Sequence, residues 1–151
     1  EKKGCLYDII DPADDTVRPN QAIAMALGIV ERGKAERAIE VVRKELLTPY
    51  GLRTLSPRDG RYMGRFSGDP SYHNGCVWPW LMGFYIEARL GLGTPKEKLA
   101  PLLAPLLLHT RDAGLGAISE IFDGDTPHEP NGCVSQAWSV AEVLRAHNML
   151  K

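Results

Sequence analysis

The sequence predicts an all-α fold with two layers of helices, and three observations support this prediction. Five segments show helical periodicity, and almost nothing in the chain alternates like a β-strand. Two long connections, at about 48–75 and 114–132, lead into the more apolar helical segments, whereas those at 33–34 and 91–95 are tight. Inner helices that follow long loops, and outer helices that stay half exposed, would produce this alternation. Composition alone is equally compatible with a plain helical bundle.

The first two helical segments carry start and stop signals. Asn20 follows Pro19 and can cap a helix that ends at Gly33, since glycine readily adopts the left-handed conformation of a helix end. The second segment, 34–47, places small and aliphatic residues on one stripe with charges opposite, which is typical of an amphipathic helix. We therefore expect a helix from 20 to 33, followed by one with a single exposed side.

The third helical segment, 76–91, is apolar on all sides, so we expect a buried helix there. Pro79 fits in its first turn, where backbone N–H groups have no partner within the helix.

The fourth segment begins with Thr94 as cap and Pro95 as first helical residue. Pro101 and Pro105 are expected to kink or interrupt it, because proline removes a backbone donor. The fifth helix, at 134–150, closes the chain.

Composition and charge argue against several classes of partner. Of the 151 residues, 44% are apolar and 25% are charged, as in an ordinary globular protein. The formal net charge is -1 and basic residues are mixed with acidic ones, so we expect neither a nucleic-acid nor an anionic-membrane partner. No apolar run approaches the ~20 residues of a membrane span, and the chain begins without a signal-peptide pattern.

The three cysteines, Cys5, Cys76 and Cys133, are widely spaced and odd in number. This pattern favours a reducing compartment over a disulfide framework, so we expect a cytoplasmic protein. The chain begins with Glu1 directly before a turn-rich segment, and we expect 1–151 to be part of a longer domain.

The segment 114–139 is the richest in side chains that could process a sugar. Acidic, imidazole, amide and indole groups stand there among glycines and prolines: Glu120, Asp123, Asp125, His128, Glu129, Gln136 and Trp138. Sugar sites need carboxylates to move protons, amides to bind hydroxyls, and flat aromatic faces for pyranose rings. The apolar neighbours of Glu120 can restrict its hydration. An acidic surface loop whose aspartates cap turns, as Asp123 before Gly124 can, explains the same residues.

Two other segments combine aromatic and polar groups. The first, 60–80, precedes the buried helix and contains Tyr62, Tyr72, His73, Asn74, Trp78 and Trp80. Two tryptophans at i and i+2 do not share a helical face. We expect Trp80 in the core, while for Trp78 a core position and a sugar platform both remain open.

The other segment, 8–21, contains Arg18 and several aspartates that could bind hydroxyls or pair with one another. Neither segment identifies a reaction by itself.

Metal and cofactor sites are not predicted. His73 lies near Cys76, and His128 lies near Cys133, but no CxxC or HxxxH pair is present. The chain also has no nucleophile-elbow serine and no Gly-rich phosphate loop.

Four long motifs, in order along nearly the whole chain, resemble the C-terminal end of glycogen debranching enzymes, the amylo-α-1,6-glucosidase domain. They are RPNQ at 18–21, LLTPYGLRTLSP at 46–57, YHNGCVWPWLMGFYIEA at 72–88 and ISEIFDGDTPHEPNGCVSQAWSVAEVLR at 118–145. The resemblance implies a glucoamylase-like α/α toroid of inner and outer helices. This chain would supply a partial toroid, roughly the last five of twelve helices.

The resemblance also implies a catalytic role. Related glucoamylases carry a Glu general base on a loop, followed by Trp-Ser near the start of the last inner helix. Here Glu120 and the pair Trp138-Ser139 fill those places, so Glu120 is the expected base of an inverting hydrolysis of α-1,6-linked glucose branches. The residues expected to bind the α-glucan are Arg18, Asn20, Tyr72, His73, Asn74, Trp78, Asp123, Asp125, His128, Gln136 and Trp138.

The general acid of such enzymes lies on an earlier loop that this chain lacks. We therefore expect the isolated chain to be inactive, or to self-associate through exposed inner helices that the rest of the catalytic domain would cover. Two alternatives stay open: a non-catalytic carbohydrate-binding or scaffold module, and a zinc-dependent toroid enzyme. Residue types alone do not distinguish α-1,6 from α-1,4 bonds, so the α-1,6 linkage is what the resemblance implies.

Overall fold

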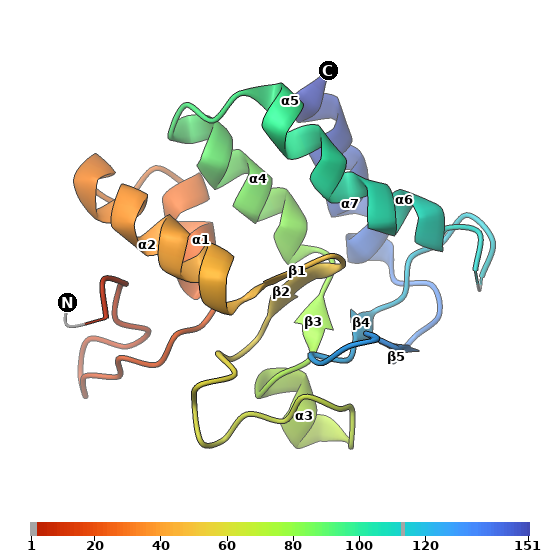
Figure 1. Ribbon diagram of the computed structural model, residues 1–151, viewed down its shortest axis with the longest axis horizontal. Helices are drawn as coiled ribbons and strands as arrows, with labels where there is room; N and C mark the ends of the chain where they lie inside the picture. The colour runs from red at the N-terminus through yellow and green to blue at the C-terminus, as the bar shows by residue number, and fades with distance from the viewer. Residues whose placement is uncertain (1–2, 113) are drawn as a thin grey trace.

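The computed structural model describes residues 3–112 and 114–151, and it is mostly helical (Figure 1). The helices are α1 (Asn20–Ala26), α2 (Arg32–Glu45), α3 (Asp69–His73), α4 (Leu81–Gly91), α5 (Lys96–Leu99), the 3₁₀ helix η1 (Ala100–Leu103), α6 (Ala104–His109) and α7 (Ala137–Leu150). Helix α4 packs between α1 and α7, while α2 packs against α1, and α5 and η1 pack against α7. Central and peripheral helices therefore alternate along the chain, as the loop lengths predict.

The first helix is shorter than predicted. It ends at Ala26 rather than near Gly33, and Gly28 follows in a left-handed conformation with φ of 69°. Helix α2 then begins at Arg32, where the Glu31 carboxylate accepts hydrogen bonds from the first backbone N–H groups. The predicted cap role of Asn20 is wrong: Pro19 occupies the cap position, and the Asn20 amide instead donates to Asp8.

The third predicted helix also begins later than its apolar pattern indicates. Helix α4 starts at Leu81, so Pro79 precedes the helix instead of lying in its first turn. The predicted interruption of the fourth segment is confirmed, because α5, η1 and α6 succeed one another around Pro101 and Pro105. Thr94 does not cap this segment; its hydroxyl accepts from Arg89.

A five-stranded antiparallel sheet corrects the all-α prediction. Its short strands are β1 (Leu47–Thr48), β2 (Gly51–Arg53), β3 (Val77–Trp78), β4 (Ile121–Phe122) and β5 (Pro130–Asn131), and they pair in chain order. In the centre, Leu52 lies opposite Trp78, and Val77 lies opposite Phe122. Strand β3 thus joins the two long connections, because it pairs with β2 of the first and with β4 of the second. Both connections lie with α3 at one end of the helical layer (Figure 1).

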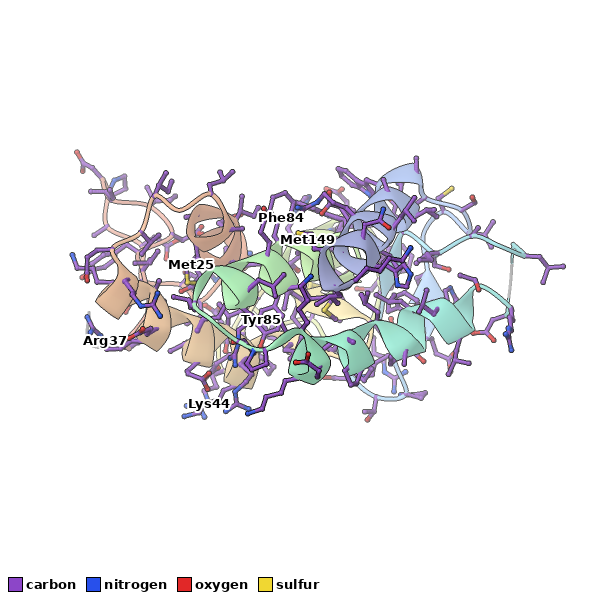
Figure 2. The ribbon with its side chains drawn as sticks, turned by 90° about the horizontal axis from the view of Figure 1, so that it is seen from above. Met25, Arg37, Lys44, Phe84, Tyr85 and Met149 are labelled. Carbon is purple, nitrogen blue, oxygen red and sulfur yellow. The ribbon has the colours of Figure 1, made fainter. Side chains whose placement is uncertain are left out.

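Helices α4 and α7 are held together by charges as well as by apolar contacts. Arg145 of α7 donates to Glu87 of α4 at 2.7 Å and to Glu142 at 2.8 Å, and its guanidinium lies over the Phe84 ring. Phe84 and Tyr85 lie on opposite sides of α4 (Figure 2). The Tyr85 ring is 2% exposed, and its burial raises the pKa of its hydroxyl.

Large apolar side chains are exposed at both ends of the row α1–α4–α7. Ile29, beyond α1, is 75% exposed, and Leu144 of α7 is 57% exposed. None of the helices in the described ranges is long and apolar enough to span a membrane.

Candidate active site

Glu120 immediately precedes strand β4, and two groups fix its carboxylate. The Cys133 backbone N–H donates to its Oε2 at 2.8 Å, and the Tyr72 hydroxyl donates to the same oxygen at 3.4 Å. The backbone is paired too, because the Glu120 N–H donates to the Cys133 carbonyl at 2.8 Å. The side chain is half-buried, so its position is defined while part of it stays accessible.

Gly132 lets the chain pass directly against this carboxylate. Its φ is 69°, and a Cβ there would lie 2.6 Å from Oε2 of Glu120 and 2.9 Å from the Tyr72 hydroxyl. Burial raises the pKa of the Tyr72 hydroxyl, and the negative charge of Glu120 raises it further. Tyr72 therefore stays protonated at neutral pH and remains a donor to the carboxylate.

Asp123 lies on the next turn of the same loop and is only 5% exposed. One of its oxygens accepts from the Phe66 N–H at 2.8 Å and from the Asn131 amide at 3.0 Å; the other accepts from Arg65 at 3.3 Å. This carboxylate therefore ties the 60–80 segment to the Glu120 loop.

Asp125 and His128 complete the loop. Asp125 is exposed and accepts from the Tyr62 hydroxyl at 2.9 Å; burial, with this hydrogen bond, raises the pKa of Tyr62 to about 12. His128 has a φ of 64° and is 8% exposed, and its Nδ1 lies 2.8 Å from the Asp123 carbonyl. The imidazole therefore supports the turn from inside it.

Arg18 and Asn74 meet at the C-terminal end of helix α3, where Asn74 is the cap residue. The Arg18 guanidinium donates to the carbonyls of Thr54 and His73 and, at 3.2 Å, to the Asn74 side chain. The His73 ring is exposed. These residues hold the end of α3, which carries Tyr72, whereas Asn20 bonds to Asp8.

A row of aromatic rings extends from the hydroxyl partner of Glu120 across α4 and α7. Tyr72 and Trp78 have ring centroids 5.5 Å apart, Trp78 and Trp138 are 5.5 Å apart, and Trp138 stacks on Trp80 at 5.3 Å. Trp138 is 45% exposed, and Trp78 is half-buried. The row thus links the tyrosine that bonds to Glu120 with an exposed indole two ring contacts away.

Most of these groups lie in the segments that the sequence indicates, but some of their partners were not predicted. Arg65 and the Cys133 N–H were not singled out, and Trp80 was expected in the core, where it is only partly buried. The backbone N–H of Cys133 cannot be recognised from sequence because every residue except proline has one. Arg65 could have been found, because it lies within the segment 60–80 that the sequence indicates. Gln136 caps α7 by accepting from the Ala137 N–H.

Two cavities, of about 730 and 620 Å³, lie elsewhere, along the N-terminal segment and α2. Neither is lined by Glu120 or by the row of aromatic rings. Within residues 3–112 and 114–151, no group of three or more His, Cys, Asp or Glu side chains is arranged to hold a metal ion.

The chain is similar in sequence to proteins that process glycogen. A family model described as amylo-alpha-1,6-glucosidase matches residues 1–145. The chain is 34% identical over 97 residues to the glycogen debranching enzyme of Saccharomyces cerevisiae, covering 55% of this chain and 6% of that enzyme.

Solved structures from Thermus thermophilus share the fold. One is an uncharacterized conserved protein, with TM-score 0.67 and 16% identity over 98% of this chain and 35% of that chain. Another is the GH63 mannosylglycerate hydrolase in complex with glucose, with TM-score 0.65 and 18% identity over 90% of this chain and 32% of that chain. The chain thus spans about a third of the length of these structures and a small part of the yeast enzyme. With its family match over residues 1–145, the chain belongs to the amylo-alpha-1,6-glucosidase family.

Proposed function

We propose that this chain supplies the general base, Glu120, of an enzyme that hydrolyses α-1,6-linked glucose branches of glycogen-like α-glucans with inversion. The observation that carries the proposal is the way the carboxylate is held. Its Oε2 accepts from Cys133 and Tyr72, while Oε1 accepts no hydrogen bond from any residue that the structure describes. A fixed carboxylate with one free oxygen can orient a water molecule and take its proton.

The reaction needs a second carboxyl group. In inverting hydrolysis, one carboxylic acid protonates the leaving oxygen while the carboxylate base deprotonates water, and the two lie roughly 6.5–9.5 Å apart. By the family resemblance, the acid lies outside these 151 residues. The complete enzyme is therefore this chain together with the part of the domain that carries the acid, and this chain alone is inactive.

The aromatic row supports the choice of a sugar substrate. Trp138 presents an exposed indole two rings away from Tyr72, the residue that holds Glu120. Pyranose rings present C–H faces that pack on such surfaces, while their hydroxyls can bind to carboxylates such as that of the exposed Asp125. The three free thiols, Cys5, Cys76 and Cys133, are compatible with cytoplasmic glycogen metabolism.

The test is Glu120→Gln in the complete enzyme, with Glu129→Gln as the matched control. Glu129 is an exposed glutamate of the same loop whose carbonyl, not its side chain, bonds to the Asp123 N–H. Loss of the base is expected to lower kcat by about 10²- to 10⁴-fold, and the control is expected to remain near wild type. Glucose release from a branched limit dextrin is measured, and NMR of the first glucose formed reports its anomeric configuration.

Three results would refute this assignment. Unchanged hydrolysis by Glu120→Gln excludes Glu120 as the base, and retention of configuration excludes inversion. Glucose release by the isolated 151-residue chain excludes an acid located elsewhere. Polysaccharide binding without hydrolysis by the wild-type complete enzyme would instead favour the non-catalytic binding module, for which the aromatic row is sufficient.

A further inference from the structure

A buried histidine lies against the segment that contains Glu120, in contact with Ser119 and Phe122. His109 ends helix α6 and is 4% exposed. Its Nε2 lies 3.0 Å from the Ser119 hydroxyl and 3.4 Å from the Ser119 backbone nitrogen, and its Nδ1 lies 3.0 Å from Asp112. Asp112, His109 and Ser119 therefore form a continuous hydrogen-bonded series that ends one residue before Glu120.

The partners define the proton positions on the ring. A backbone N–H can only donate, so Nε2 facing Ser119 acts as an acceptor. Nδ1 then carries the hydrogen and donates to the Asp112 carboxylate. In this arrangement, Asp112 selects the tautomer whose Nε2 can accept a hydrogen bond from Ser119.

The ring also contacts the other end of the Glu120 segment. Its centroid lies 4.8 Å from that of Phe122, edge to face, and 6.3 Å from that of Tyr50. His109 thus touches the residues on both sides of Glu120 and Ile121. Ser119 is 2% exposed, whereas the neighbouring Glu120 is half-buried, so the contact with His109 is internal while the carboxylate stays partly accessible.

We propose that His109, oriented by Asp112, is a positioning residue that fixes the Glu120 carboxylate through Ser119. This inference rests on the proposed function, in which Glu120 is the base. Ser119 is 2% exposed and too deeply buried to attack a substrate, so the series anchors the segment before β4 instead of providing a nucleophile. A displacement of about 1 Å in a catalytic group can cost about 10²-fold in rate. The hydrogen bonds between His109 and Ser119, one residue before Glu120, should therefore affect kcat.

The test compares His109→Asn with His109→Gln in the complete enzyme. Asparagine is too short to reach Ser119, whereas the glutamine amide extends to the level of Nε2 and can accept from it. We expect His109→Asn to lower kcat by about 10- to 100-fold, with KM within about twofold, and His109→Gln to restore most of the turnover. His147→Asn, at an exposed position of α7, is the matched control and should leave both constants unchanged.

Two further variants keep the test decisive if His109→Asn does not fold. Asp112 is 67% exposed in its side chain, so its replacement spares the core. Asp112→Ala should lower kcat severalfold, whereas Asp112→Asn, which keeps an acceptor for Nδ1, should not.

Wild-type kcat in a folded His109→Asn variant, or equal kcat in Asp112→Ala and Asp112→Asn, overturns the positioning role. If Glu120→Gln is inactive in the same assay, only this inference has failed. If Glu120→Gln is active, the proposed function itself has failed.

Discussion

The substitution Gly132→Ala tests how strictly the Glu120 carboxylate must be placed. A Cβ at this position would lie 2.6 Å from Oε2 of Glu120, whereas ordinary contact begins at 3.4 Å. The carboxylate must therefore move by about 0.8 Å or the loop must yield, and a shift of this size costs on the order of 10- to 100-fold in kcat. Alanine with φ near 69° adds about 1–2 kcal/mol of backbone strain.

Gly116→Ala separates these two effects. Gly116 has a φ of 82°, and a Cβ there would meet nothing within 4 Å. Both variants should lose about 1–2 kcal/mol in free energy of unfolding, but only Gly132→Ala should lose turnover. In the complete enzyme, urea unfolding measures the stability of each variant, and glucose release from limit dextrin measures its kcat. Equal kcat in the two variants would refute the reasoning, since it would show that contact with Glu120 is irrelevant to the rate.

Three further predictions concern the frame of the site. Gly51→Ala should lower the free energy of unfolding in urea by about 3 kcal/mol or more, because a Cβ would overlap the Trp78 carbonyl; a loss below about 1 kcal/mol would contradict this. Iodoacetamide at about pH 8, followed by peptide mapping, should label the exposed Cys133 rapidly. Cys76 should be labelled only after unfolding, because it is buried and burial raises the pKa of its thiol to about 11. The free energy of unfolding should fall between about pH 10 and 12, because Tyr62 ionises near pH 10.0 in the unfolded chain while its pKa in the folded protein is raised to about 12. Urea unfolding at about pH 10 and about pH 12 measures this fall, and Tyr62→Phe should remove the contribution of Tyr62 to it.

The helical layers were predictable because their signal is repeated over many residues. The stripe of α2, the prolines inside the α5–η1–α6 segment and the apolar surface of α4 all correspond to observed elements. Helix ends were less predictable, since Gly28 and Gly33 are both plausible stops and only the first is used. An apolar run likewise does not show that Val77 and Trp78 leave the helix to pair in a sheet.

The strands could not be predicted from pattern, because alternation needs at least about four residues and these strands have two or three. Their pairing depends on contacts between positions distant in sequence, such as Val77 with Phe122. The proximity of Tyr72 to Glu120, 48 residues apart, has the same origin. What the sequence could indicate was the composition of each loop, and this identified the segments that the sheet then joins.

The sheet also explains why the helices matter for chemistry that takes place outside them. Strands this short are not stable on their own, so their pairing depends on the helices that they enter. Strand β3 leads into α4, and the loop after β5 leads into α7. Helices α4 and α7 are joined by the Arg145 contacts and by the Glu142 side chain, whose carboxylate lies where a Cβ at Gly83 would stand. The helix interface therefore fixes how β3, with Trp78 and the neighbouring Tyr72, meets the loop of Glu120. In this arrangement, the position of the carboxylate is a consequence of helix packing, transmitted through two-residue strands.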